Sequence, residues 1–539
     1  MREGFRQSMA WLHTWTGLIV AWVLFFVFVT GTAGYFNYEI TRWMEPERPL
    51  AGTPLEYDRV ALVENGLDRL QQVAPEAEFW AINLPHWAQA QRAWQDYSIE
   101  WTSLPQEGHE RGRRGSEQLD PATGGLRTDI EPRDTGGGRQ LYVMHYALHY
   151  IDYPIAFRLV GICTMLMLVA IISGVITHKK IFKDFFTFRP GKGQRSWLDA
   201  HNVISVMALP FFLMITYSGL MFFAQQYMPA VGAVTYGTDR AAIERFYDDL
   251  YGAHAHEAVS RPRADIGEMM DKALATWGSD TQLRSVFIQQ DSGEPPRVQI
   301  GRAYGDAVLW REGHDLSYHA DTGEPLPAEP EDNATVQSVQ FMFGLHEGRF
   351  AEPWLRWLYF IAGLLGCGMI GTGMVLWTVK RRKQHAAAGT HFGHRLVEAL
   401  NVATIAGLPA GVAAYFWANR LLPVELADRA SWEVNVLFLI WGETLIYALF
   451  RDIRKAWVEL LWLAAAAYAL LPLVNALTTD RHLGVTLPAG DWTLAGFDLT
   501  MLALGAAFGY MAIKVQRRWL AKITDTAPAA RSAVAGGAR

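Results

Sequence analysis

Residues 11–31, WLHTWTGLIVAWVLFFVFVTG, form an almost unbroken apolar run with a histidine near its start. A similar run, LDAHNVISVMALPFFLMITYSG, occupies residues 198–219, and in both runs a glycine follows the histidine by 18 residues. Each run has the roughly 20 apolar residues that a membrane-spanning helix needs. The chain therefore contains an internal repeat that is built on a membrane helix.

Two further pairs of motifs belong to the repeat. The turns LDPATGGL (119–126) and YHADTGEPL (318–326) are similar, and each precedes a Leu-His pair, in YALHY at His149 and in FGLHEG at His346. The unit is thus a membrane helix, an outer segment and a second membrane helix, and it occurs twice. Helical periodicity followed by short strand-like pieces predicts one helix packed on a small antiparallel sheet in each outer segment.

The composition suits a chain that is part membrane and part soluble. Half of the 539 residues are hydrophobic and 19% are charged, which is too apolar for a soluble protein and too charged for a membrane bundle alone. The net charge of -6 argues against nucleic acid as a partner. Cys163 and Cys367 lie in apolar runs and predict neither a disulfide framework nor a thiolate metal site. The sequence has no recognised nucleotide-binding loop.

The predicted fold class is an all-α membrane bundle of about eight helices with two small α+β outer domains. The predicted spans lie near 10–37, 155–177, 200–226, 355–378, 396–418, 433–450, 456–474 and 496–514. Lys and Arg follow every second span and also begin the chain, which places both termini in the cytoplasm and the outer domains in the periplasm. Membrane lipid is the expected surrounding of the bundle.

These features predict seven parts of the chain. They are helix one (1–38), outer domain one (39–140), helices two and three (141–226), outer domain two (227–340), helix four (341–380), a bundle of helices five to eight (391–520) and a solvated tail (521–539).

Histidines at the ends of the spans form two predicted layers. The cytoplasmic layer contains His13, His178, His201 and His394, and the outer layer contains His145, His149 and His346. Imidazoles from facing helices suit the two axial positions of a haem iron. The 18 residues from His13 to Gly31 rise about 27 Å, which is most of a hydrocarbon core about 30 Å thick. Two haems, one in each layer, would therefore be needed to carry electrons across.

Two alternatives stay open for these residues. Zinc would need further protein ligands, and Asp199 beside His201 and Glu347 beside His346 keep such a site possible. Arg158 and Arg356 stand at the outer edge of spans, where they suit either pairing with haem propionates or snorkelling to the membrane interface.

Taken together, WLHTWTGL, YALHY, SWLDAHN, FGLHEG and the two Thr-Gly turns resemble the PepSY-associated transmembrane family over roughly residues 5–380. The sequence is most similar there to bacterial inner-membrane ferrisiderophore reductases, including those of ferrioxamine and pyoverdine uptake. The resemblance implies two haem b groups (iron-protoporphyrin IX) that reduce a periplasmic Fe(III)-siderophore. It also implies an electron donor, either quinol or a cytoplasmic reductase, and periplasmic siderophore-binding and iron-uptake proteins as partners.

The resemblance also implies which histidines hold the haems. The implied pairs are His149 with His346 for the outer haem and His13 with His201 for the inner haem. His178 stays an alternative inner ligand, because it aligns with Trp377 in the second repeat and so departs from the pattern. His145, one helical turn before His149, is the alternative outer ligand.

Two function classes compete with this interpretation. One is a non-catalytic membrane protein whose PepSY-like domains bind a peptide or regulate a protease, and the other is an electron-transfer subunit for a different periplasmic acceptor. Glu443, inside the sixth span, suits proton relay, a quinol contact or a neutral hydrogen-bonded role. An aromatic cluster suits either chelate docking or core packing, and its members are Trp80, Trp87, Trp94, Tyr97 and Trp101.

Overall fold

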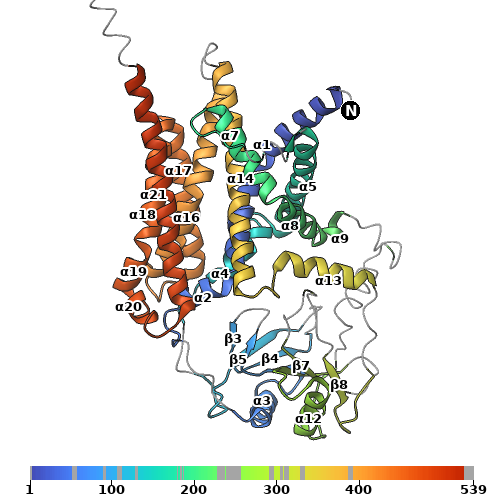
Figure 1. Ribbon diagram of the computed structural model, residues 1–539. Coiled ribbons are helices and arrows are strands. Elements are labelled where there is room, and N and C mark those ends of the chain that lie inside the picture. The colour runs from blue at the N-terminus through green and yellow to red at the C-terminus, as the bar shows by residue number, and fades with distance from the viewer. Residues whose placement is uncertain are drawn as a thin grey trace, which may run out of the picture. The chain divides into compact units, whose positions relative to one another are not determined.

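In the computed structural model the chain folds into two compact units (Figure 1). The helical unit consists of Met1–Gly52, Pro132–Tyr217 and Leu355–Arg539, and the sheet unit consists of Thr53–Glu131 and Ser218–Trp354. The structure describes residues 3–50, 57–88, 93–105, 112–127, 132–178, 180–181, 185, 187–227, 237, 257–290, 296–303, 308, 315–327, 334–385 and 392–526.

All regular secondary structure in the described part of the helical unit is helical. The first part contains α1 (Glu3–Gly34), α2 (Asn37–Met44), α4 (Gly137–Tyr146), α5 (Tyr153–Thr177), α7 (Gln194–Met207), most of α8 (Leu209–Met221) and α14 (Pro353–His385). The C-terminal part contains α15 (Phe392–Val402), the π-helical turn η1 (Ala403–Gly407), α16 (Leu408–Leu421), α17 (Arg429–Phe450), α18 (Ile453–Ala469), α19 (Leu471–Thr478), α20 (Leu483–Thr486) and α21 (Trp492–Thr526).

Seven segments among the described residues are helical, long and apolar enough to cross a membrane. They are Gly4–Gly34, Tyr153–Thr177, Pro353–Arg382, Phe392–Leu421, Arg429–Phe450, Ile453–Thr478 and Trp492–Trp519. Helices α7 and α8 pass the same test together but are bent by 66°. Pro210 in the first turn of α8 lacks the N–H that would continue the helical hydrogen bonds across this break. The predicted third span is thus a broken helix, and the other seven are confirmed as long apolar helices.

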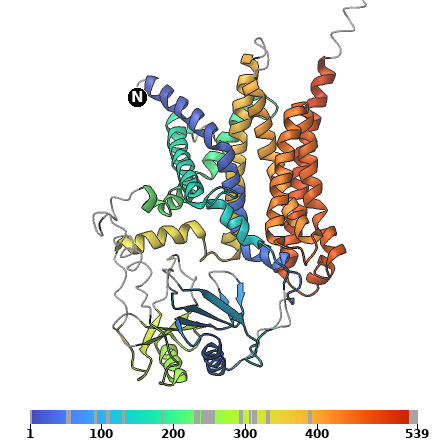
Figure 2. The same cartoon turned by 180° about the vertical axis from the view of Figure 1, so that it is seen from behind.

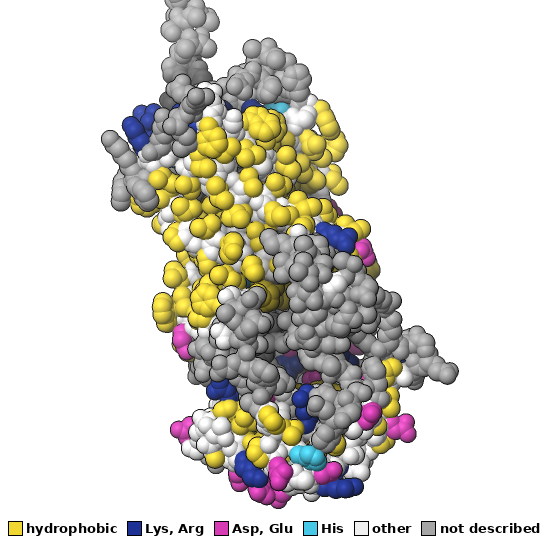
Figure 3. All heavy atoms as spheres, turned by 90° about the vertical axis from the view of Figure 1, so that its right-hand side faces the viewer, with side chains coloured by type: hydrophobic (Ala, Val, Ile, Leu, Met, Phe, Trp, Pro, Cys, Tyr) yellow, Lys and Arg dark blue, Asp and Glu magenta, His cyan; other side chains and the backbone are white. Residues whose placement is uncertain are grey.

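The surface of the helical unit is apolar. On the face shown in Figure 3, hydrophobic side chains cover the helices, and Lys and Arg side chains gather near their end. Large side chains such as Phe450, which is 88% exposed, point outward with no covering residue. An exposed apolar surface of this extent marks contact with lipid or with another protein.

A buried network of charged side chains ties the C-terminal helices to the segment before α4. Arg429 and Glu433, one turn apart on α17, are both fully buried and form an ion pair. Glu433 accepts a hydrogen bond from Thr135 Oγ1 at 2.6 Å, and Arg429 Nη1 donates to the carbonyl of Asp134 at 3.0 Å. Buried charges are stable only when they are paired and hydrogen-bonded. The network therefore fixes the start of α4, the helix that carries His145.

The sheet unit combines both outer segments. Its elements are α3 (Arg59–Val73), β1 (Ala77–Asn83), β2 (His86–Ala88), β3 (Ala93–Gln95), β4 (Ser98–Ser103), β5 (Arg114–Gln118), α9 (Ala224–Tyr227), α12 (Ile266–Trp277), β6 (Leu283–Gln289), β7 (Arg297–Arg302), β8 (Leu316–His319) and α13 (Ala334–Glu347). Six strands form one sheet in the order β5-β4-β1-β6-β7-β8, and β2 and β3 form a separate hairpin. Figure 2 shows α3 and α12 on the same face of the large sheet.

The structure differs here from the two separate outer domains that the sequence predicts. Strand β1 of the first segment pairs antiparallel with β6 of the second, with Trp80 opposite Ile288 and Ile82 opposite Val286. These four side chains lie in one hydrophobic core that both segments share. Pairing of the two edge strands satisfies backbone groups that two separate three-stranded sheets would leave exposed. Each repeat thus supplies half of a single domain.

Candidate functional site

Two histidines that the repeat relates, His13 on α1 and His201 on α7, lie close together in the helical unit. Their ring centres are 6.2 Å apart and their planes are inclined by 59°. Both rings are partly buried among the helices. The structure therefore brings together the two histidines that the family resemblance implies as the inner pair.

Backbone carbonyls orient both rings. His13 Nδ1 lies 2.8 Å from the carbonyl oxygen of Ala170 on α5, and His201 Nδ1 lies 3.0 Å from that of Met369 on α14. A carbonyl oxygen only accepts, so each Nδ1 carries the proton and donates it. In the neutral ring this leaves a lone pair on Nε2, which points away from the carbonyl. A hydrogen bond of this kind is what fixes the tautomer of a metal-ligating histidine.

Glycines make room for the two rings. A Cβ atom at Gly174, four residues after Ala170, would lie 3.0 Å from His13 Cε1. A Cβ atom at Gly373, four residues after Met369, would lie 3.3 Å from His201 Cε1. Both distances are tighter than ordinary van der Waals contact, so any larger side chain would displace the ring. Each inner histidine therefore packs on a glycine and bonds to the carbonyl one turn before it.

The outer layer shows the same kind of contact on α1. His145, in the last turn of α4, places Nδ1 2.7 Å from the carbonyl oxygen of Val27. A Cβ atom at Gly31, four residues later, would lie only 2.4 Å from that Nδ1. Gly31 is the glycine that follows His13 by 18 residues, so α1 contributes a histidine near one end and a histidine-packing glycine near the other.

The second repeat has its counterpart within the sheet unit. His346 on α13 places Nδ1 3.2 Å from Ser218 Oγ, and a Cβ atom at Gly219 would lie 2.8 Å from its Cε1. Gly219 is the repeat partner of Gly31. By this contact His145, and not His149, is the structural equivalent of His346. The 18-residue spacing from His13 to Gly31 and from His201 to Gly219 marks the two glycines in the sequence. The spacing alone does not show which histidine packs on each glycine.

His149 has a different environment. It lies beyond the end of α4, where its ring stacks on Phe438 with centres 5.6 Å apart and planes inclined by 15°. Gln140 Nε2 lies 3.4 Å from His149 Nδ1. An amide nitrogen donates, so Nδ1 is the acceptor and the ring proton resides on Nε2. His149 in this arrangement does not present a free Nε2 lone pair.

His178 is also engaged elsewhere. It caps the C-terminal end of α5, and Asn202 Nδ2 donates to its Nε2 at 2.9 Å. The Nε2 atom of His178 thus bonds to Asn202, the residue after His201. The ring that lies next to the His201 ring is that of His13.

The two arginines that the sequence singles out differ in burial. Arg158 is exposed on α5, whereas Arg356 at the start of α14 is largely buried. Arg356 Nη2 lies 2.6 Å from Glu39 Oε1, and its guanidinium lies 4.4 Å from the ring centre of Phe36. Within the described residues, Arg356 Nε and Glu39 Oε2 are buried and have no hydrogen-bond partner. An unsatisfied buried N–H of this kind suits a carboxylate such as a haem propionate.

His13 and His201 are the residues that would hold one metal ion between them. A metal–imidazole bond is about 2 Å, and the ring centre lies roughly 1 Å beyond the nitrogen, so two opposed ligands have centres about 6 Å apart. The 6.2 Å between His13 and His201 matches this value. Zinc would need a third protein ligand, and within the described residues no group of three or more His, Cys, Asp or Glu side chains could hold a metal ion. Two imidazoles are a ligand set that a haem iron accepts.

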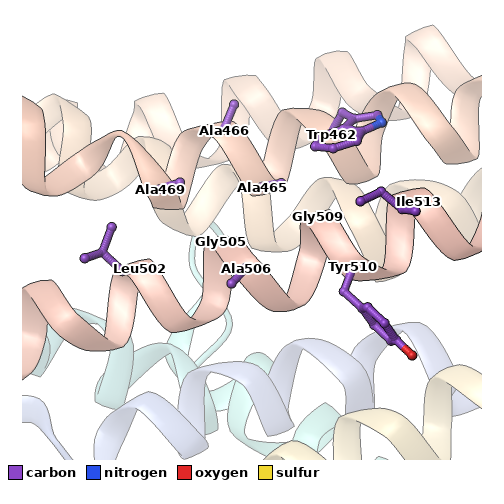
Figure 4. Close-up of a pocket in the computed structure, with 10 residues that line it drawn as sticks. All are labelled: Trp462, Ala465, Ala466, Ala469, Leu502, Gly505, Ala506, Gly509, Tyr510 and Ile513. Carbon is purple, nitrogen blue, oxygen red and sulfur yellow. The ribbon is translucent and has the colours of Figure 1, made fainter.

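A groove lies between α18 and α21, and Figure 4 shows the side chains that line it. Its volume is about 530 Å³. It is lined by Trp462, Ala465, Ala466, Ala469, Leu502, Gly505, Ala506, Gly509, Tyr510 and Ile513. None of these side chains is ionisable near neutral pH or a usual metal ligand, so the groove offers mainly apolar contact.

Core packing accounts for the members of the aromatic cluster whose side chains are described. Trp80 and Tyr97 are each 1% exposed and belong to the core of the sheet unit, and Trp101 packs against that core. Tyr97 donates to the carbonyl of Leu62 and Trp80 Nε1 donates to that of Ala74. The side chains of Trp87 and Trp94 lie outside the described residues.

Comparison with known proteins gives one result that bears on all of these positions. The family described as PepSY-associated TM region matches residues 10–380, which include both repeats and every histidine considered above except His394. No curated protein matches the chain. Since the match covers more than half of the chain, this protein, with its seven apolar helices, is a membrane protein that belongs to the PepSY-associated TM family.

Proposed function

We propose that this protein carries single electrons across a bacterial inner membrane and reduces Fe(III)-siderophores in the periplasm. In this proposal His13 and His201 hold an inner haem b. His346 holds an outer haem b together with His149 or His145, and of these two His145 is favoured by its contact with Gly31. The orientation follows the positive-inside pattern of the basic connections.

One observation carries the proposal. His13 and His201 come from equivalent places in the two repeats and have ring centres 6.2 Å apart. Each donates Nδ1–H to a backbone carbonyl one turn before the glycine on which its ring packs. A packing histidine needs only one satisfied nitrogen and no facing partner. Two neighbouring rings that each donate Nδ1–H to a carbonyl, and so each keep a lone pair on Nε2, instead suit one ion between them.

One-electron transfer needs few protein groups beyond these histidines. When bound, haem supplies an iron that accepts and gives up one electron at a time. The chain's own residues then hold Nε2 of each histidine in position and exclude water among apolar helices. Reduction of a bound ferric ion to Fe(II) weakens its attraction for the hard oxygen ligands of a siderophore, so the iron is released without an acid–base pair.

The test begins with the absorption spectrum of the purified full-length protein. The proposal predicts a Soret band and, after reduction with dithionite, the α-band of b-type haem, and it predicts reoxidation when a ferric siderophore is added without oxygen. Protein that lacks a Soret band after expression with haem precursor would favour the non-catalytic PepSY alternative. Haem that is reduced normally but is not reoxidised by ferric siderophores would favour another periplasmic acceptor.

A further inference from the structure

Helix α17 turns one face away from the rest of the helical unit. Its outward residues recur at helical spacing and are Trp432, Leu439, Gly442, Glu443, Ile446, Tyr447 and Phe450. Leu439 and Ile446, on either side of Glu443, are 59% and 58% exposed. Opposite them, Glu433, Leu437 and Thr444 are buried. The carboxylate of Glu443 thus stands in the middle of a largely apolar face.

Glu443 lies well inside the membrane span. The span runs from Arg429 to Phe450, so Glu443 is about 21 Å from its first residue and about 10 Å from its last at 1.5 Å per residue. It makes no hydrogen bond or ion pair with any part of the chain that the structure describes. An ionisable side chain at membrane depth is costly unless it has a partner. A partner for Glu443 from beyond the described residues would have to reach it within the membrane, as a lipid-soluble molecule does.

A polar line leads from Glu443 to the end of the helix. Tyr447 lies one turn further on, at the spacing where helix side chains are neighbours, and its hydroxyl donates to Glu459 on α18. Glu459 in turn accepts from Arg451 Nη2 at 2.6 Å and from Arg451 Nε at 3.0 Å. Arg451 directly follows the last residue of α17. The side of the helix that carries Glu443 therefore also carries a hydrogen-bonded chain from Tyr447 through Glu459 to Arg451 at the end of the span.

We propose that this face binds the head group of a membrane quinol, whose hydroxyl donates to Glu443. A quinol supplies the hydroxyl donor that the carboxylate lacks, and it resides in the acyl region. Gly442 has no atom within 4 Å of a Cβ position, so the surface beside Glu443 is open to a flat ring, and Leu439 and Ile446 offer apolar contact on its two sides. The inference rests on the proposed function, because that function needs an electron donor and the sequence has no nucleotide-binding loop.

The step balances with the quinol as reductant. Oxidation of one quinol to quinone releases two electrons and two protons. The electrons leave singly and would pass to the one-electron carrier of the proposed function. The Glu443 carboxylate accepts one proton at a time, and Tyr447, one turn further on, begins the hydrogen-bonded chain to Glu459 and Arg451 that leads toward the end of the helix predicted to be cytoplasmic. Both protons leave in that direction.

The test compares two reductants on the purified full-length protein in lipid nanodiscs. A short-tailed ubiquinol and dithionite are each used to reduce the haem, and the rate is followed by absorbance. Glu443→Gln should lower the rate with ubiquinol at least tenfold and leave the rate with dithionite unchanged. Glu425→Gln removes an exposed carboxylate between α16 and α17, outside the spans, and should change neither rate. An unchanged ubiquinol rate in Glu443→Gln overturns the inference.

Two further readouts separate this inference from the proposed function. Photolabelling with an azido-quinone tests binding even in protein without haem, and labelled peptides should come from residues 439–450 and disappear with excess quinone. Labelling elsewhere overturns the quinol site. The mass of the purified protein, measured by light scattering in detergent, tests whether a second copy of the chain covers this face instead of a quinol. A mass that falls by half in Glu443→Gln, with unchanged quinol labelling, assigns the face to a second copy and overturns the inference.

Discussion

Gly31→Ala is a sharp perturbation, because the added methyl group meets a histidine. A Cβ atom there would lie 2.4 Å from His145 Nδ1 and 2.6 Å from its Cε1, whereas ordinary contacts begin near 3.4 Å. The ring must therefore move by about 1 Å, and the 2.7 Å hydrogen bond to the carbonyl of Val27 is then lengthened or broken. The same helix offers a control, since a Cβ atom at Gly17 has nothing within 4 Å.

The magnitude follows from three terms. Overpacking costs about 1–3 kcal/mol, and a buried donor without its acceptor costs about 1–3 kcal/mol. Replacing glycine by alanine inside a helix stabilises the folded state by roughly 0.5–1 kcal/mol. We therefore expect Gly31→Ala to destabilise the protein by about 1–5 kcal/mol, because both costs fall on one side chain. Gly17→Ala has only the favourable term and should be neutral or slightly stabilising.

The assay is thermal unfolding of the purified protein in detergent, followed by circular dichroism, together with haem content per protein. Gly31→Ala should unfold at a lower temperature than Gly17→Ala and should retain less haem. The combination Gly31→Ala with His145→Ala should recover stability relative to Gly31→Ala alone, because the clash is gone. If Gly31→Ala unfolds at the temperature of Gly17→Ala and keeps its haem, the histidine–glycine contact is not a constraint on this fold.

Two further predictions concern stability. Arg429→Leu leaves Glu433 buried without its ion pair and should cost about 3–5 kcal/mol in thermal unfolding, whereas the double variant with Glu433→Leu should regain much of that loss; equal melting of both variants would refute the role of the pair. Burial raises the pKa of Tyr97 in the sheet unit, so its contribution to stability is complete below the unfolded pKa of about 10 and declines as pH rises above it. Melting temperatures between pH 8 and 11 should fall more steeply than those of Tyr97→Phe, and parallel curves would contradict this.

The repeat and the spans could be predicted from sequence because both depend on local pattern. Apolar runs of membrane length mark the helices directly, and the fixed spacing from His13 to Gly31 and from His201 to Gly219 marks the repeat. The break between α7 and α8 is visible in hindsight at Pro210, but a proline inside an apolar run does not state the angle of the bend.

What could not be predicted depends on contacts between distant segments. The pairing of β1 with β6 joins the two repeats into one sheet, and no local pattern says which edge strands meet. The position of His149 shows the same limit, because YALHY aligns with FGLHEG by its Leu-His pair. The chain nevertheless packs His145 on Gly31, where α4 ends and the loop that carries His149 begins.

The most direct test of the central claim counts haem in variants of the inner pair. The account predicts that full-length protein binds two haems, measured as the pyridine haemochrome per polypeptide. His13→Ala and His201→Ala should each bind one, and the double variant should also bind one, because both rings hold the same iron. The residual haem should have the same electron paramagnetic resonance signal in all three variants. Two haems in either single variant, or different residual signals in the two, would contradict the pairing of His13 with His201.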